Sequence, residues 1–228
     1  MIGLFARKVG MTQVFDGEGN AIPVTILELL ENVVTAKLTT EKNGYSALQI
    51  GAEIVKEKKL TKPQIASLQK KNLALFRTLK EFRVAPEVVS KYEIGAELDA
   101  GEILGEEGSL IDVKARPIGK GTTGRIKRWN QSRRRMSHGT KHHRQIGSAG
   151  AGTTPGRVFK GLHMPGRDSE DVTISHLKLF KYIPEKKALL IKGAIPGFDG
   201  ALIQVKPSLK KGEWNKTALS IGKRQVLV

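Results

Sequence analysis

The sequence predicts a mainly β chain: a small β-barrel that carries a short helical insertion and one long, extended basic segment. Three observations support this prediction. Most apolar residues lie in short, β-branched runs separated by Gly, Pro and Asn, a pattern typical of a closed barrel or a sandwich. Residues 62–80 instead show helical spacing. Residues 113–167 are poor in the large apolar side chains that a core requires.

The first predicted strands form a hairpin. Residues 12–16 lead through Gly17-Glu-Gly-Asn20 into the apolar run 21–30, and a Gly/Asn-rich turn between two apolar runs indicates a β-hairpin. The other predicted strands are short and bounded by turn residues; they span 33–40, 45–54, 110–115, 172–182, 188–192 and 201–205.

The exception to the strand pattern is the stretch from Lys62 to Lys80. Pro63 stands at a position suited to the first turn of a helix, because proline there loses no hydrogen bond. The apolar residues that follow have helical spacing; they are Ile65, Leu68, Leu75, Phe76 and Leu79. We therefore predict one or two short helices, as an insertion at about 60–80.

Charge is distributed very unevenly along the chain. The whole sequence has 39 Lys and Arg against 22 Asp and Glu, a formal net charge of +17. Between Asp112 and Asp168 there is no carboxylate, and this stretch contains 14 of the Lys and Arg residues. An excess of this kind indicates a polyanionic partner: nucleic acid, an anionic membrane or an acidic protein. A solvated basic loop is the alternative, but ordinary surfaces mix both signs of charge.

The same stretch has too little apolar surface to fold by itself. It contains seven Leu, Ile, Val or Phe residues and ten glycines in 55 positions. Burial of so few side chains does not offset the conformational entropy lost on ordering. We therefore expect a globular body from residues 1–112 and 168–228, and an arm, residues 113–167, that stays extended until a partner neutralises it.

The sequence offers little for a membrane, metal or cofactor site. There is no cysteine, which excludes disulfides and thiolate ligands, and no run approaches the length of a membrane span, so we expect a soluble chain. Gly119-Lys-Gly-Thr-Thr-Gly124 matches a dinucleotide-binding pattern formally. That site would also need a following amphipathic helix and a carboxylate about 20 residues later, neither of which the sequence indicates. We predict no cofactor.

The histidines of the stretch, His138, His142, His143 and His163, are its candidate metal ligands. A metal site would need more ligands, and catalysis would need a nucleophile or an orienting acid, so both uses are disfavoured. Imidazoles among cations suit stacking on bases and contacts with phosphates instead.

Two other features of the stretch suit RNA. Trp129 lies among arginines, where it could stack on an unpaired base, the alternative being docking on the protein's own barrel. The run Gly147-Ser-Ala-Gly-Ala-Gly-Thr-Thr-Pro-Gly156 has almost no side-chain volume, which indicates the tip of the arm or a flexible linker.

Four motifs, in order along the chain, resemble the bacterial type of the ribosomal large-subunit protein three family, with features of its cyanobacterial and plastid members. They are Phe-Ala-Arg-Lys-Val-Gly-Met-Thr-Gln-Val-Phe-Asp at 5–16, Met-Ser-His-Gly-Thr-Lys-His-His-Arg at 136–144, Thr-Thr-Pro-Gly-Arg-Val-Phe-Lys-Gly at 153–161 and Leu-Leu-Ile-Lys-Gly-Ala-Ile-Pro-Gly at 189–197. The sequence departs from the family at Ala151, where some members carry a methylated glutamine, and at Asp168-Ser-Glu170. It also departs in a divergent tail from about Ser208.

The resemblance implies a structural, non-enzymatic component of the large ribosomal subunit. It implies a translation-factor-like β-barrel, an arm reaching through rRNA toward the peptidyl transferase centre, and a role in subunit assembly. The expected partners are large-subunit rRNA and neighbouring ribosomal proteins, without homo-oligomers, membranes or small-molecule substrates. The expected compartment is the ribosome of a bacterial cytoplasm or a plastid stroma.

On this basis and on the charge pattern, the expected rRNA contacts are Lys120, Arg125, Lys127, Arg128, Trp129, Arg133, Arg134, Arg135, His138, Lys141, His142, His143, Arg144, Arg157, Lys160 and Arg167. The expected tip of the arm comprises Gly147, Ser148, Gly150, Ala151, Gly152, Thr153, Thr154, Pro155 and Gly156. One face of the barrel is expected to share the RNA contact. The alternatives are an RNA-modifying enzyme and a general nucleic-acid-compacting protein.

Overall fold

The computed structural model describes residues 1–209, and these form two compact units. The first, here called the body, contains Met1–Arg116 and the chain from Val172 onward; the second, here called the basic segment, is Pro117–Asp171. The basic segment begins four residues later than the expected arm, because the strand before it continues through Ala115 with Val113 and Ala115 buried. Most of the predicted divergent tail, from residue 210, lies outside the described residues.

The strands account for most of the regular structure. The strands of the body are β1 Leu4–Phe15, β2 Ala21–Leu29, β3 Val33–Leu38, β4 Ala47–Ile54, β5 Phe76–Arg83, β6 Leu110–Ala115, β9 Val172–Ile183, β10 Ala188–Lys192 and β11 Leu202–Pro207. Its helices are α1 Thr40–Asn43, α2 Lys62–Gln69, α3 Pro86–Lys91 and α4 Ala100–Leu104, with short 3₁₀ turns η1 Glu57–Lys59 and η2 Pro184–Lys186. The prediction of a mainly β chain is confirmed.

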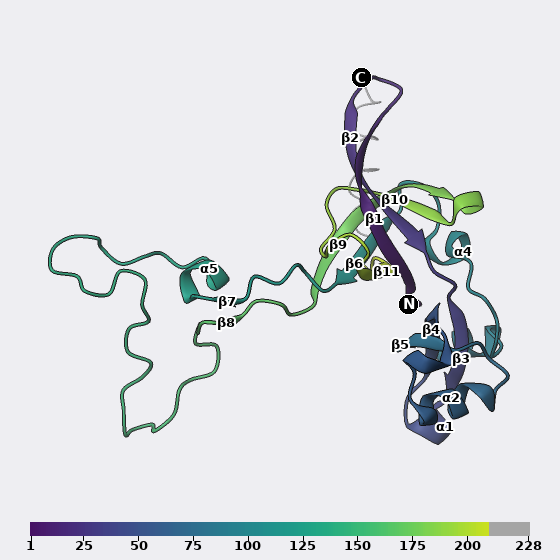
Figure 1. Ribbon diagram of the computed structural model, residues 1–228, viewed down its shortest axis with the longest axis horizontal. Helices are drawn as coiled ribbons and strands as arrows, with labels where there is room; N and C mark the ends of the chain where they lie inside the picture. The colour runs from purple at the N-terminus through teal and green to yellow at the C-terminus, as the bar shows by residue number, and fades with distance from the viewer. Residues whose placement is uncertain (210–228) are drawn as a thin grey trace, which may run out of the picture. The chain divides into compact units, whose positions relative to one another are not determined.

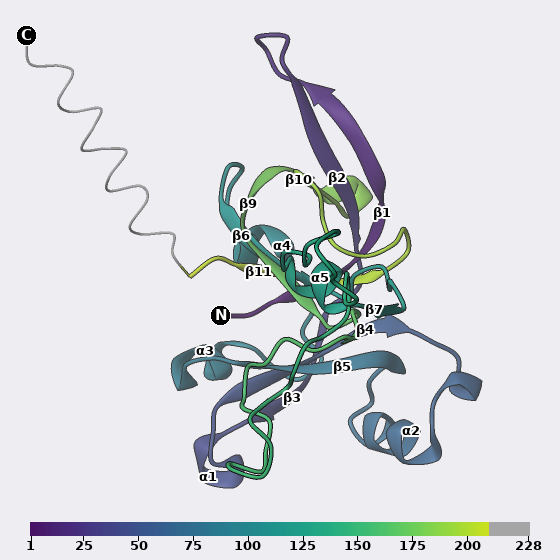
Figure 2. The same ribbon diagram turned by 90° about the vertical axis from the view of Figure 1, so that its left-hand side faces the viewer.

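Six strands of the body form one antiparallel sheet in the order β1–β11–β6–β9–β10–β2, which closes because β2 pairs again with β1. The predicted hairpin is the β1–β2 pair, in which Phe15 lies opposite Ala21. The closure pairs β1, near the start of the chain, with β11, since Leu4 lies opposite Val205. Figures 1 and 2 show β1 and β2 continuing together past the other strands of this sheet.

Alternate side chains of the closed sheet form the core. Successive side chains of a strand point to opposite faces, so one face of each strand can be buried completely. The residues with no exposed surface include Leu4, Ala6, Leu27, Ile111, Val113, Leu189, Ile191, Ile203 and Val205. Each large aliphatic side chain among them contributes roughly 1.5–3 kcal/mol through burial.

A second sheet, β3–β4–β5, packs with short helices beside the closed sheet. It corrects part of the predicted helical insertion. Residues 62–69 are helical, as α2, and Thr61 with Gln64 forms a capping box at its start. Residues 76–83 are instead strand β5, paired along β4 with Phe76 opposite Ile54. The 3–4 spacing of Leu75, Phe76 and Leu79 fits a helix locally, but pairing with the edge of β4 buries Phe76 and Phe82 on a strand.

The helices α1, α3 and α4 were not predicted. Each has six residues or fewer, which is too short for a hydrophobic period to be visible in the sequence. Within residues 1–209, no helix has the length and apolar character needed to cross a bilayer.

Candidate nucleic-acid interface

The basic segment has little regular structure of its own. It contains the two-residue strands β7 Thr122–Thr123 and β8 Gly166–Arg167 and the one-turn helix α5 Arg125–Trp129. In Figure 1 the remainder is an extended chain that leaves α5 in loops and returns to β8. A short helix does follow Gly124, although the sequence indicated no amphipathic helix there. With five residues and no buried side chain, it is not the amphipathic helix that a dinucleotide site requires.

The two ends of the segment are held together. Thr122 and Thr123 of β7 lie opposite Arg167 and Gly166 of β8, and the Thr123 hydroxyl donates to the Gly166 carbonyl oxygen at 3.2 Å. Lys120 and Asp168 form an ion pair at 3.8 Å, and their partly exposed side chains limit its strength. The outgoing and returning chains are therefore fastened at the base of the segment.

The carboxylates at the returning base have a clear role. Asp168 and Glu170 pair with Lys120 and Arg128 respectively. The second pair is 3.7 Å apart, with Arg128 largely covered and Glu170 exposed. These two residues thus supply anions that pair with cations of the outgoing chain.

Trp129 also holds the outgoing and returning parts of the chain together at this base. Its indole Nε1 donates to the Met164 carbonyl oxygen at 2.9 Å, and its ring stacks on His163 with centroids 4.5 Å apart and 14° between planes. The Arg128 guanidinium lies 5.0 Å from the ring centroid and also donates to the Met164 carbonyl. Trp129 therefore packs on the returning chain of its own segment, a contact that no local sequence signal indicated.

His163 is held in a defined orientation by Gln131. The Gln131 amide nitrogen, which can only donate, lies 2.7 Å from His163 Nδ1, so Nδ1 is the acceptor. Arg125 Nε donates to the amide oxygen of the same glutamine, which fixes the orientation of the amide. The hydrogen-bond chain Arg125–Gln131–His163 therefore ends at the ring that stacks with Trp129. Of the predicted RNA contacts, Arg125, Arg128 and Trp129 thus also have contacts within the segment.

Replacing Trp129 by alanine is expected to open the base of the basic segment. The stack and the indole hydrogen bond each contribute about 1 kcal/mol, so their loss should raise the population of the opened base by roughly tenfold or more. Hydrogen exchange reports this at the Asp168 amide, which donates to the Gly121 carbonyl. Trp129→Phe keeps a stacked ring but loses the indole donor, so its exchange rate at Asp168 should lie between those of the intact protein and Trp129→Ala. Unchanged exchange in Trp129→Ala would contradict the fastening role.

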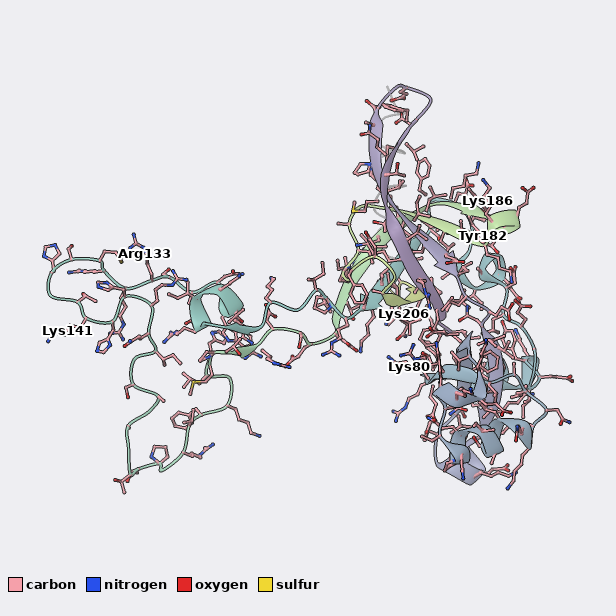
Figure 3. The ribbon with its side chains drawn as sticks, viewed as in Figure 1. Lys80, Arg133, Lys141, Tyr182, Lys186 and Lys206 are labelled. Atoms are coloured by element: carbon pink, nitrogen blue, oxygen red, sulfur yellow. The ribbon has the colours of Figure 1, made fainter. Side chains whose placement is uncertain are left out.

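Most predicted RNA-binding side chains are open to solvent. The exposed members are Lys120, Lys127, Trp129, Arg133, Arg134, Arg135, His138, Lys141, His142, Arg144, Arg157, Lys160 and Arg167. Between Arg133 and Lys160 none of the cations forms an ion pair with a carboxylate of residues 1–209. Figure 3 shows Arg133 and Lys141 on one loop of the segment.

That loop is braced by backbone contacts and not by side-chain burial. The Arg134 amide donates to the His143 carbonyl at 3.3 Å, and His143 Nδ1 donates to the Arg135 carbonyl at 3.2 Å. His142 Nδ1 lies 2.9 Å from the Gln145 side-chain oxygen. Two of the three histidines therefore have partners, and the guanidinium groups are left free to bind a polyanion. No metal-binding group of His, Asp and Glu occurs in the described part of the chain.

The predicted tip is a compact, exposed turn. The Gly156 amide donates to the Gly152 carbonyl at 3.1 Å, and both glycines have positive φ, 95° at Gly152 and 67° at Gly156. The Ser148 hydroxyl donates to the Gly150 carbonyl at 2.8 Å. Residues 150–156 are exposed throughout, so their backbone can approach another surface closely.

The body has a cavity of about 280 Å³ with a different character. Its wall includes Glu97, Asp99 and Tyr182, and Lys187 pairs with Glu97 at 3.7 Å. Burial raises the pKa of the Tyr182 hydroxyl, and the nearby Asp99 and Glu97 carboxylates raise it further. Such an acidic wall repels phosphates, so this cavity is not a candidate site for nucleic acid.

Comparison with known proteins decides the family. The family model described as Ribosomal protein L3 matches residues 62–181, which include the whole basic segment. The chain is 46% identical to large ribosomal subunit protein uL3 of a Picosynechococcus strain, over 91% of this chain and 96% of that protein. The chain belongs to the ribosomal protein L3 family.

Other members of the L3 family cover the chain to the same extent. The chain is 46% identical to large ribosomal subunit protein uL3 of a Geobacillus strain, over 91% of this chain and 97% of that protein. It is 43% identical to the uL3c protein of Nicotiana tabacum, over 91% of this chain and 80% of that protein. The recognition of the family from its motifs is confirmed, including its cyanobacterial and plastid forms. L3 proteins are structural and not enzymatic, which leaves the RNA-modifying alternative without support.

Proposed function

We propose that this chain is a structural component of the large ribosomal subunit and that its basic segment binds large-subunit rRNA. The observation that carries the proposal is the row of exposed cations from Arg133 to Lys160, which have no carboxylate partners among residues 1–209. Membership of the L3 family supplies the context, because its relatives are named as large-subunit proteins. The compartment is the ribosome of a bacterial cytoplasm or of a plastid.

Phosphate neutralisation provides most of the affinity in this proposal. Arginine and lysine side chains displace counterions from RNA, which gives strong and salt-dependent binding. Specificity comes from RNA shape, since side chains do not reach the bases in the deep groove of A-form RNA. At the base of the segment, where Trp129 and His163 stack, the outgoing and returning parts of the chain are held together. RNA orders the loops beyond this base.

The body and the tip of the basic segment have separate places in the subunit. The body acts as a translation-factor-like barrel, which the closing order of its six strands supports, and one of its faces also meets rRNA. The turn at 147–156 points toward the peptidyl transferase centre. Its small side chains and exposed backbone suit a narrow path between RNA helices. Ordering of the segment by RNA makes the chain an early assembly component.

Sedimentation tests the proposal. The intact protein should remain with large subunits through a high-salt sucrose gradient, and a variant lacking residues 120–160 should be incorporated poorly. The reason is that the deletion removes most cations of the basic segment while leaving the strands of the body intact. Intact protein that washes into the light fractions, while the subunits stay complete, would show that it is a peripheral factor.

A further inference from the structure

The outer half of the β1–β2 hairpin extends beyond the closed sheet. Among residues 1–209, β1 pairs with β11 only from Leu4 to Arg7, and β2 pairs with β10 only from Val24 to Glu28. From residue 11 to residue 23 no side chain is buried. Figures 1 and 2 both show this hairpin projecting from the body.

The projecting part of β1 has a free edge. Beyond the contact of Lys8 with Ala201, no strand of residues 1–209 pairs with the outer edge of residues 10–15. Natural proteins protect such edges with charged residues, proline or a bulge, because an open edge accepts another strand. Here a bulge lies between Lys8 and Gly10, but no charged residue follows it before Asp16.

One face of the projecting hairpin is mostly apolar. Residues directly opposite each other in a sheet share a face, and the register places Phe15 opposite Ala21 and Gln13 opposite Pro23. Met11 lies on the same face, and its side chain and that of Phe15 are 51% and 63% exposed. We call these five residues the hairpin face. Large apolar side chains gathered on an exposed surface typically mark an interaction site.

The stretch of chain that forms the hairpin carries a charge opposite to that of the chain as a whole, with Lys192 of β10 as a cation that acts on its turn. Residues 9–36 contain no Lys or Arg and four carboxylates, in a chain of net charge +17. Asp16 in the turn accepts hydrogen bonds from the amides of Asn20 at 2.9 Å and Glu18 at 3.0 Å. The bond from Asn20 is the largest cause that lowers the pKa of Asp16 below its usual value, so this carboxylate stays charged. A negative turn disfavours RNA and favours a basic protein.

We propose that the free edge of β1 and the hairpin face are a docking surface for a basic protein. Its extended segment lies along residues 10–15 as an added strand, with apolar side chains against Met11 and Phe15. Its lysines or arginines lie near Asp16 and Glu18. The turn is braced by the Asp16 hydrogen bonds, so little order has to be gained on binding. This inference uses none of the residues assigned to RNA.

Cross-linking in cells tests the proposal. A benzophenone side chain is installed at Gln13, in the middle of the hairpin face, in the full-length protein. Cells are irradiated before lysis, and the cross-linked peptides are identified by mass spectrometry. We expect one protein, joined through a segment rich in Lys or Arg. Cross-links to RNA, to residues 210–228 of the same chain or to a second copy would overturn the proposal. A variant with benzophenone at Thr140, in the basic segment, is the positive control. If that variant cross-links under the same conditions and the Gln13 variant gives no product, the proposal is also overturned.

Matched variants show whether the apolar face is responsible. In the Gln13-benzophenone background, Met11→Lys or Phe15→Lys should lower the cross-link yield about tenfold, since each removes one apolar contact from the interface. Thr12→Lys is the control, because Thr12 is also exposed but lies on the opposite face. Equal losses in all three variants would contradict docking through this face.

The same cells separate this inference from the proposed function. Sedimentation of the chain with large subunits reports the proposed function, whereas the cross-link forms before lysis and does not depend on that association. A chain found outside the subunits but joined to a basic protein would refute the first and support the second. A chain inside the subunits whose hairpin cross-links to RNA would support the proposed function and refute the docking surface.

Discussion

Replacing Arg133, Arg134 and Arg135 together by alanine is expected to weaken binding of the full-length protein to its rRNA fragment by roughly two to three orders of magnitude at about 0.1 M salt. The three guanidinium groups are exposed and have no carboxylate partner among residues 1–209. Each phosphate contact contributes about 0.7–0.9 to the slope of log affinity against log salt. Filter binding at several salt concentrations measures both the affinity and the slope.

The slope makes this prediction sharper than an affinity alone. If about half of the 14 cations of residues 113–167 meet phosphates, the intact protein should have a slope of roughly −5 to −6, and the triple variant a slope of roughly −3. The matched control replaces Lys56, Lys58 and Lys59 by alanine, which removes the same charge from exposed positions of the body. The control should keep the slope of the intact protein. A slope near −1 for the intact protein would count heavily against RNA binding by the segment.

Replacing Phe76 by alanine is expected to lower the free energy of unfolding of the body by about 3–5 kcal/mol. The ring is 2% exposed and packs on Gly51, where an added Cβ would meet it at 2.7 Å. Gly51 has no side chain that could fill the space left by the ring, so truncation leaves a cavity in the core. Urea denaturation of the full-length protein, followed by circular dichroism, measures the loss.

A matched control lies directly across the strand pair. Ile54 is opposite Phe76 in the β4–β5 register but is 53% exposed. Ile54→Ala should therefore cost less than about 1 kcal/mol. Similar midpoints for the two variants would show that residues 76–83 do not form the buried strand, and would revive the helix that their spacing suggests.

Much of this protein is predictable from the sequence because the relevant signals are local. The bounds of β6 and β10 coincide with the predicted runs 110–115 and 188–192, since β-branched residues between turn residues favour a strand whatever its partner. The separation of charge into one carboxylate-free stretch is likewise visible without coordinates. The four motifs were sufficient to recognise the family. The RNA-binding roles of the individual side chains remain predictions.

Tertiary structure decided what depends on residues far apart in the chain. Pairing with β4 made a strand of residues 76–83, although their local spacing fits a helix. Folding of the basic segment back on itself placed His163 and Met164 against Trp129, more than 30 positions earlier, and gave that ring a partner within the protein. Sheet closure left the far half of the β1–β2 hairpin without a strand paired along either outer edge among the described residues. A local pattern specifies which face of a strand is apolar, but the burial of that face depends on which distant strand pairs beside it.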